Sequence, residues 1–396
     1  MKKVAIYTGT YPDTTFLTLL ARGLADSGVE VHIYGKLKRK TKEDYNIKFF
    51  TYSDKNKGYN FYFILKYVFL NLFFNYKKAI WYYRHIKSEE AYSIYKKSLI
   101  ILPMIYHQPD IIHLQWIQSF KIFRELDEIL NAKIVVSIRG SQLSISSFLY
   151  PDAWQTTVDA TNKAVKIHSI SDDLSLQLLK INPLVRDKII KINPAIDLNL
   201  FYTAEASFNR ARSNPLRIIT VCRLSWKKGL AYGLEALKKI HDKGLNFEYI
   251  IIGEGKQREE LTFLIRDLGL TNKVKLKGRL SQTEIRKALL NSDVFLLPSV
   301  QEGFSNAVVE AQAIGLPCLV SDAEGLEENI EHEKTGFIFK NRNVPELAAL
   351  LEQFTKISNK DYIILKRNGV ERSKARYDIK DQIIALKNLY ENIDII

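Results

Sequence analysis

The chain has 396 residues, of which 46% are hydrophobic and 26% charged, and this composition excludes a disordered protein and predicts two globular domains. Its only cysteines, Cys222 and Cys318, make neither a disulfide framework nor a structural zinc site, and they fit a reducing compartment. The formal net charge of +14 favours an anionic partner: a nucleotide, a phospholipid surface or a nucleic acid.

The first half of the chain alternates short β-branched runs with helical stretches. Strands are expected at residues 3–10, 29–35, 110–116, 132–140, 165–171 and 189–196, and helices at 15–27 and from Asp172. This alternation is typical of a parallel sheet covered by helices on both faces.

The second half repeats the pattern after a polar stretch, residues 202–215, which we interpret as a linker. Strands are expected at 216–224, 247–255, 274–280, 294–299 and 317–322, with helices between them. We therefore predict two doubly wound α/β domains, residues 1–198 and 199–377. The amphipathic C-terminal segment, 378–396, has the apolar face needed to pack back on the first domain. Ligands of such sheets bind at the carboxyl ends of the strands.

Two of these strand ends in the second domain carry residues suited to bind phosphate. Arg223 and Lys228 lie in VCRLSWKKG, where a guanidinium offers a planar fork and an ammonium a point charge. The alternative for both is ordinary surface charge. The turn IIIGEG contains Gly253 and Gly255, which fit either a close approach to a ligand or a bare tight turn.

The stretch SVQEGFSNAVVEAQAIG, residues 299–315, places two acids around the start of a helix. Ser305 or Asn306 caps that helix, and its unpaired first N–H groups form an anion site that Gly303 lets a ligand approach. Glu310, about one turn inside, is placed to accept hydrogen bonds from ribose hydroxyls, and Glu302 to reach hydroxyls beyond the phosphates. The alternative is that Glu302 only complements the helix dipole and Glu310 is a solvated helix residue.

These segments resemble glycosyltransferase family four. The string EGFSNAVVE has its Glu-x7-Glu spacing, and RLSWKKG, IIGEG, LPSVQEGF and GLPCLVSD resemble its second-domain motifs, while TYPDTTF and DIIHLQW resemble first-domain segments. The resemblance implies a GT-B fold, in which two Rossmann-like domains face across a cleft. It also implies a retaining transfer from a nucleotide-sugar donor, with UDP favoured, to a saccharide or lipid-linked acceptor, with no metal or other cofactor.

The resemblance also assigns roles to individual residues. Arg223 and Lys228 would contact the diphosphate, Glu310 the ribose and Glu302 the donor sugar. The turn would help through its backbone at Gly303, Phe304, Ser305 and Asn306, and the turn at Gly253 would lie beside the donor. His113 would lie near the reacting centre, so that the residues expected to act in catalysis are His113, Glu302, Arg223 and Lys228.

On the acceptor side the chain departs from the family pattern. Arg139-Gly140 stands where many members carry His-Gly. Arg139 is therefore expected to bind an anionic acceptor or the diphosphate, or to brace the cleft. Thr10, in the loop after the first strand, is expected on the same side.

A basic, aromatic stretch lies between the first strands. Residues 36–97 hold 15 basic and 5 acidic side chains, and residues 59–106 interleave lysines with aromatic and aliphatic residues. We expect these residues to form an amphipathic helical pair on an anionic membrane, with the protein cytoplasmic and peripheral on the inner face. The alternative is a helical hairpin that packs on its own sheet.

Three functions remain open from the sequence. We favour a glycosyltransferase of surface polysaccharide, lipopolysaccharide or capsule synthesis. A nucleotide-sugar epimerase of similar fold would need neither an acceptor nor a membrane. A basic membrane- or nucleic-acid-binding protein is suggested only by charge, and we expect no nucleic-acid partner because the basic region is too rich in Phe and Ile for a phosphate track.

Overall fold

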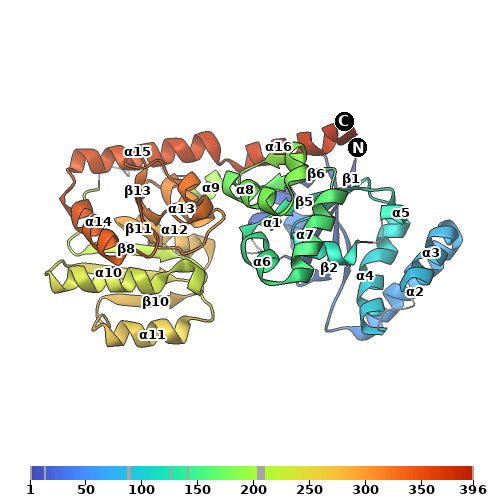
Figure 1. Ribbon diagram of the computed structural model, residues 1–396, viewed down its shortest axis with the longest axis horizontal. Helices are drawn as coiled ribbons and strands as arrows, with labels where there is room; N and C mark the ends of the chain where they lie inside the picture. Colours follow the sequence, from blue (N-terminus) through green and yellow to red (C-terminus); the bar gives the residue numbers. More distant parts are fainter. Residues whose placement is uncertain are drawn as a thin grey trace. The chain divides into compact units, whose positions relative to one another are not determined.

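The computed structural model describes residues 2–12, 15–86, 91–124, 127–140, 142–202 and 210–394. The chain divides into two compact units. Unit 1 comprises Met1–Asn193 and Ile379–Ile396, and unit 2 comprises Pro194–Asp378. Each unit contains one parallel sheet with helices packed on it (Figure 1), so the predicted GT-B class, with two Rossmann-like α/β domains, is confirmed.

Unit 1 is built on a seven-stranded sheet in the order β3-β2-β1-β4-β5-β6-β7. All of its strand pairs are parallel. The order reverses between β1 and β4, so the switch point where ligands of such sheets bind lies at the carboxyl ends of these two strands. The strands are β1 (Lys3–Tyr11), β2 (Glu30–Leu37), β3 (Lys48–Tyr52), β4 (Ile111–Leu114), β5 (Lys133–Ile138), β6 (Lys166–Ser169) and β7 (Ile189–Lys191).

The helices of unit 1 include one from the far end of the chain. Helix α16 packs against α1, where a Cβ on Gly23 would lie 2.0 Å from Cδ1 of Ile383, so a larger residue at position 23 would require the Ile383 side chain to move. The helices are α1 (Thr15–Asp26), α2 (Lys57–Phe74), α3 (Tyr76–Ile86), α4 (Ala91–His107), α5 (Asp127–Leu130), α6 (Ser147–Leu149), α7 (Pro151–Lys163), α8 (Asp172–Ile181) and α16 (Ile379–Glu391).

Unit 2 is built on a six-stranded parallel sheet in the order β10-β9-β8-β11-β12-β13. Its switch point lies between β8 and β11, the two strands that precede the predicted phosphate-binding segments. The strands are β8 (Leu216–Val221), β9 (Phe247–Ile252), β10 (Val274–Gly278), β11 (Val294–Leu297), β12 (Cys318–Ser321) and β13 (Gly336–Phe339).

The helices of unit 2 pack in neighbouring pairs: α10 lies against α14, and α13 lies against α15 (Figure 1). Apolar side chains of α10 and α14 form one core with those of β8, β9 and β11. The helices are α9 (Leu198–Phe201), α10 (Leu230–Asp242), α11 (Arg258–Asp267), α12 (Gln282–Leu290), α13 (Asn306–Ala313), α14 (Val344–Lys356) and α15 (Asn359–Arg376).

The linker predicted at residues 202–215 lies partly outside the described residues, since 203–209 are not described. The described part, 210–215, is held to unit 2. Arg210 pairs with the buried Asp293 at 2.7 Å, and Arg212 donates to the carbonyl oxygen of Phe354 at 2.6 Å.

Candidate functional site

Two loops meet at the switch point of unit 2, one after β8 and one after β11. The backbone N–H groups of Val300 and Gln301 donate to the carbonyl oxygen of Lys227, at 2.6 and 3.1 Å. Gly229 has a φ of 59°, and a Cβ there would lie 1.9 Å from the carbonyl oxygen of Pro298. The two loops therefore fix each other through backbone contacts, which hold the side chains they carry in place.

Lys228 and Glu302, one from each loop, form an ion pair. Only 19% of the lysine side chain and 14% of the glutamate side chain are exposed. Burial alone would lower the pKa of Lys228, but the Glu302 carboxylate outweighs it and the pKa lies above its ordinary value. Lys228 is therefore a fixed positive charge at the switch point.

Arg223 stands in the same loop and is exposed. Burial is the main reason that the pKa of Lys227 is lowered, and the nearby charges of Arg223 and Lys228 lower it further. Three cationic side chains therefore lie in one loop, and of these Lys228 forms the ion pair with Glu302. Such a site attracts a phosphate group.

The turn at Gly253 packs against this loop. A Cβ on Gly253, whose φ is 140°, would lie 1.8 Å from the carbonyl oxygen of Cys222, and one on Gly255 would lie 2.0 Å from that of Leu224. Packing of the turn against the β8 loop is therefore enough to require both glycines. A contact between Gly253 and a ligand stays a prediction.

Helix α13 begins at the switch point with an open N-terminus. Ser305 is the N-cap, and its side chain accepts a hydrogen bond from the N–H of Val308 at 3.4 Å. The first N–H groups of a helix have no partner within it, so those of Asn306 and Ala307 face outward at the positive end of the helix dipole. This arrangement is the anion site that the sequence indicated. The side chain of Phe304 is buried against Tyr377, so only its backbone borders this site.

Glu310 lies one turn further along α13. No hydrogen bond or ion pair to its carboxylate is found among the described residues. Burial raises its pKa to about 8. A carboxyl group held without a partner in a poorly solvated place is a candidate to receive hydrogen-bond donors from a ligand.

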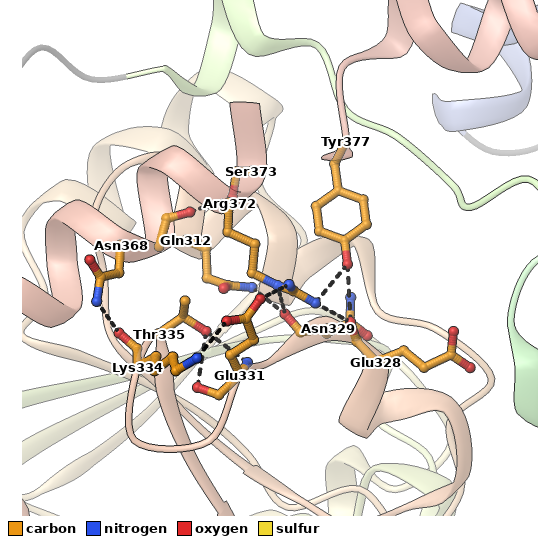
Figure 2. Close-up of polar contacts among 11 residues, drawn as sticks. Gln312, Glu328, Asn329, Glu331, Lys334, Thr335, Asn368, Arg372, Ser373 and Tyr377 are labelled. Carbon is orange, nitrogen blue, oxygen red and sulfur yellow. Dashed lines mark hydrogen bonds and ion pairs between the residues drawn. The ribbon is translucent and has the colours of Figure 1, made fainter. Parts of the chain in front are cut away.

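Two residues that the sequence analysis missed hold this helix start in place. Asn329 is fully buried; its Oδ1 accepts from the N–H of Ser305 at 3.1 Å, and its Nδ2 donates to the carbonyl oxygen of Ser305 at 3.2 Å. Arg372, from α15, donates through Nη2 to the carbonyl oxygen of Glu328 at 2.7 Å and through Nη1 to Glu331 at 2.5 Å (Figure 2). Arg372 thus fixes the segment that carries Asn329, and Asn329 fixes the N-cap.

Figure 2 shows that this network continues to Tyr377, whose hydroxyl donates to the carbonyl oxygen of Glu328 at 3.0 Å. Gln312, on α13 itself, donates to the carbonyl oxygen of Asn329 at 2.8 Å. The helix start is therefore tied to segments 24 to 72 residues further along the chain, and no local motif could have revealed these ties.

His113 does not lie at an open site, contrary to the sequence prediction. It is fully buried in the middle of the sheet of unit 1, and both ring nitrogens have partners: Nδ1 lies 2.6 Å from the hydroxyl of Tyr390, and Nε2 lies 2.8 Å from Oγ of Ser137. Burial is the main reason that its pKa lies well below its ordinary value. These contacts give His113 a structural role, and its part in catalysis stays a prediction. A strand end read from sequence does not tell which face the ring occupies.

The hydrogen bonds around His113 form a single chain with a definite direction. Nε2 of His168 lies 2.9 Å from the carbonyl oxygen of Ile192, so this nitrogen carries the proton and Nδ1 accepts from Ser137. Ser137 then accepts from Nε2 of His113, whose Nδ1 accepts from Tyr390. Both histidines are neutral, and the chain ties α16 to β4, β5 and β6.

The predicted acceptor-side residues lie at the carboxyl ends of the strands of unit 1. Arg139 directly follows β5, and its Nη2 donates to Oε1 of Gln115, just after β4, at 2.9 Å. Gly140 has a φ of 35°, and a Cβ there would meet no atom within 4 Å. The carbonyl oxygen of Thr10, in β1, accepts from the hydroxyl of Thr8 at 2.8 Å.

Among the described residues, no group of three or more His, Cys, Asp or Glu side chains is placed to hold a metal ion.

Comparison with known proteins finds similarity over both units. Residues 203–372 match the family described as "Glycosyl transferases group 1". The chain is 32% identical over 206 residues to a putative colanic acid biosynthesis glycosyltransferase, WcaL, of Escherichia coli, a match that covers 50% of this chain and 49% of that protein. It is 41% identical over 147 residues to the amylovoran biosynthesis glycosyltransferase AmsK of Erwinia amylovora, covering 36% of each chain. These matches therefore span half or less of the relatives' length.

The similarity in structure covers the whole chain. The crystal structure of HepE from Anabaena in complex with UDP superposes with a TM-score of 0.74, covering 99% of this chain and all of that one, at 17% sequence identity. At this identity the likeness establishes the fold alone.

Proposed function

We propose that this chain is a glycosyltransferase that takes a sugar from a nucleoside-diphosphate sugar, because residues 203–372 match the glycosyl transferases group 1 family. The family resemblance read from the sequence is confirmed over those residues. The relatives WcaL and AmsK are named for the biosynthesis of colanic acid and amylovoran, and we extend a role in polysaccharide synthesis to this chain.

The observation that carries the proposal is the convergence of two phosphate-binding devices on one switch point. The β8 loop brings Arg223 and the half-buried ammonium of Lys228, and the β11 loop brings the open N-terminus of α13. Backbone hydrogen bonds between the loops hold the two together. Glu310 lies one turn along the same helix, where a ribose bound next to the phosphates would meet its carboxylate.

This geometry suits the chemistry of sugar transfer. When the bond between a sugar and a diphosphate breaks, negative charge develops on the leaving phosphate and positive charge on the sugar ring. Arg223, Lys228 and the α13 N-terminus are fixed positive groups in place before the reaction, which is the arrangement that lowers such a barrier. Glu302, held beside Lys228, is placed to bind hydroxyls of the departing sugar. We propose that the transfer retains the anomeric configuration and needs no resident metal.

UDP is the donor nucleotide that we propose, and support comes from the HepE structure, which is a complex with UDP. Isothermal titration of the full chain with UDP, GDP and ADP tests the site. We expect UDP to bind, and Arg223→Ala or Lys228→Ala to weaken binding and to lower turnover at least a hundredfold. The loss of one such group typically raises the activation free energy by about 3–4 kcal/mol.

Lys243→Ala is the matched control. Lys243 lies on the loop after α10, where it forms an exposed ion pair with Glu352 of α14. This control should bind UDP like the wild type. Near-normal turnover in Arg223→Ala or Lys228→Ala, or no binding of any nucleoside diphosphate, would refute the proposed site. A product that is an epimerised nucleotide sugar, formed without acceptor, would favour the epimerase instead.

We further propose that helices α2 and α3 of unit 1 rest on an anionic membrane surface. Helix α2 buries Asn60, Phe63, Tyr67 and Asn71, and Asn71 donates to the carbonyl oxygen of Leu102 in α4. Its outward face is apolar. The α2–α3 surface consists of exposed large apolar side chains, between 41% and 76% accessible: Tyr59, Phe61, Tyr62, Leu65, Phe69, Leu72, Phe73, Phe74, Tyr76, Ile80 and Tyr83.

The charge of this surface fits negatively charged lipid. Residues 57–86 contain five basic side chains, Lys57, Lys66, Lys77, Lys78 and Arg84, and no acidic one. Helices with apolar side chains flanked by lysines lie in the interface of a bilayer, with the cations toward the headgroups. Among the described residues, no helix is long and apolar enough to cross a membrane.

Vesicle flotation tests this contact. We expect the protein to float with phosphatidylglycerol vesicles at low salt and to float less with them at high salt. It should not bind phosphatidylcholine vesicles. Phe69→Ser combined with Phe73→Ser should abolish flotation. Leu184→Ser is the control, because Leu184 is 88% exposed in unit 1 but lies outside the α2–α3 surface. Flotation that persists in the double variant would show that this surface is not the contact.

A further inference from the structure

Arg139 and Gln115 form a buried polar pair at the switch point of unit 1. Gln115 follows β4, and its N–H donates to the carbonyl oxygen of Tyr7 in the neighbouring β1 at 3.1 Å. Arg139 follows β5 and reaches back to Gln115. The pair therefore lies where the strand order reverses, which is the place where a doubly wound sheet binds its ligand.

Two donors of the pair have no hydrogen-bond partner among the residues that the structure describes. Only 5% of Arg139 and none of Gln115 is exposed. These donors are Nε of Arg139 and Nε2 of Gln115, and both are buried without a hydrogen-bond partner in the described part of the chain. Buried polar groups are almost always paired, so two unpaired donors side by side indicate a missing acceptor.

The charge of Arg139 is also uncompensated. No carboxylate pairs with its guanidinium among the described residues; its contacts are the amide oxygen of Gln115 and the ring of Phe16, whose centroid lies 4.7 Å away. Burial lowers the pKa of Arg139 to about 10, so the group still carries its charge at neutral pH. A buried charge without a counter-ion is costly and persists where function requires it.

Helix α1 adds a second positive feature. Phe16 lies in the first turn of α1, which contains no acidic residue. The ring that stacks on the guanidinium therefore brings the positive end of the helix dipole to the same place.

We propose that Arg139 and Gln115 bind an oxyanionic group of the acceptor, a phosphate or a carboxylate, inside unit 1. This inference rests on the proposed function, because it assigns the anion to the sugar acceptor. The planar fork of a guanidinium matches a phosphate or carboxylate in two parallel hydrogen bonds, and the amide of Gln115 supplies a third donor. A neutral saccharide would leave the charge of Arg139 unpaired, so the acceptor class is anionic.

Isothermal titration of the full chain, with saturating UDP present to fill the site in unit 2, tests the assignment. The probes are inorganic pyrophosphate, glucuronate and glucose. We expect pyrophosphate or glucuronate to bind and glucose not to bind. Binding of pyrophosphate alone would identify a diphosphate-linked acceptor, and binding of glucuronate alone would identify an acidic sugar.

Two variants connect the binding to this pair. Arg139→Gln should weaken anion binding by about 10- to 100-fold, the usual effect of losing a charged hydrogen bond. Gln115→Glu places a carboxylate against Arg139 without a change of shape, so it should abolish anion binding and raise the melting temperature. The affinity for UDP should stay within about twofold in both variants, compared with the 10- to 100-fold effect on the anion.

Several results would overturn the inference. These are the failure of both anions to bind, anion binding that is unchanged in Gln115→Glu, and a fall in UDP affinity that matches the fall in anion affinity. The last result would assign Arg139 to the donor. UDP binding, measured alone, tests the proposed function separately, because a protein that binds no nucleotide can still bind pyrophosphate at Arg139.

Discussion

The carboxylate of Glu302 pairs with the ammonium of Lys228, so one residue predicted to bind the donor sugar holds another predicted to bind its diphosphate. In the ligand-free protein the two charges satisfy each other. A diphosphate that enters the site must compete with Glu302 for Lys228. The Glu302 carboxylate therefore weakens binding of the phosphates, while it contributes to binding of the sugar.

Glu302→Gln should separate these two effects. Without the negative charge, UDP should bind at least about fivefold more tightly, since a contact between two like charges is worth about 1 kcal/mol even when water screens it fully. Turnover should nevertheless fall by about 10- to 100-fold, because a charged hydrogen bond to the sugar is lost. Titration with UDP and steady-state kinetics measure the two quantities. Weaker UDP binding would show that Glu302 does not compete for Lys228.

Nucleotide binding should depend on the ionisation of Glu310. Its pKa in the free protein is about 8, so the carboxylate that accepts ribose hydroxyls is a minor species at neutral pH. UDP affinity should rise by up to about tenfold per pH unit as the pH approaches 8, and level off above it. Glu310→Gln is the control: it should bind UDP more weakly and lose this dependence. An identical pH profile in both proteins would contradict the assignment.

The positions of the phosphate-binding segments could be predicted from sequence, because the alternation of strands and helices locates the carboxyl ends of strands. The segments that follow β8 and β11 carry the cationic residues and the helix start that indicated a phosphate site. The short edge strands β3 and β13 were not predicted, since four or five residues between polar segments show too little alternation to be recognised. Helices α14 and α15 were also missed.

Contacts between distant segments could not be predicted. Asn329 is hydrogen-bonded to Ser305, 24 residues before it in the chain. Arg372 is hydrogen-bonded to Asn329, 43 residues before it. His113 is hydrogen-bonded to Tyr390, 277 residues away. Such partners are brought together only by the tertiary fold, so a sequence pattern around any one of them carries no sign of the other.

Asn329 should act as a positioning residue for the donor site. Asn329→Ala removes both hydrogen bonds to the backbone of Ser305, and we expect a loss of stability of about 1–3 kcal/mol together with weaker UDP binding. Ser358→Ala removes a comparable helix cap, at the start of α15, and should cost about 1 kcal/mol without affecting UDP. Thermal unfolding and titration distinguish them. Equal UDP affinity in the two variants would leave Asn329 a purely structural residue.

Unit 1 should lose stability in acid because its buried histidines stay neutral. Burial lowers the pKa of His168 to about 3, whereas in the unfolded chain it is about 6.5. The unfolded state therefore binds a proton that the folded state does not, and the contribution of His168 to stability falls as the pH drops from about 6.5 toward 3. Urea unfolding between pH 7 and pH 5 measures this loss. His168→Gln, if it folds, should lose less unfolding free energy between pH 7 and pH 5 than the wild type. A larger loss in the variant would contradict a neutral buried ring.

Tyr390→Phe distinguishes a structural from a catalytic His113. The variant keeps the ring of Tyr390 but leaves Nδ1 of His113 buried without its donor, which typically costs about 1–3 kcal/mol of unfolding free energy. If His113 only ties α16 to the sheet, the folded variant should transfer sugar at the wild-type rate, with an unchanged pH profile and unchanged UDP affinity. If His113 took part in proton transfer, the loss of the hydroxyl would change its pKa and would therefore shift the pH–rate profile. Rates measured between pH 5 and pH 9, below the melting temperature of both proteins, decide between the two, and the closed hydrogen-bond chain from Tyr390 to Ile192 leads us to expect no shift.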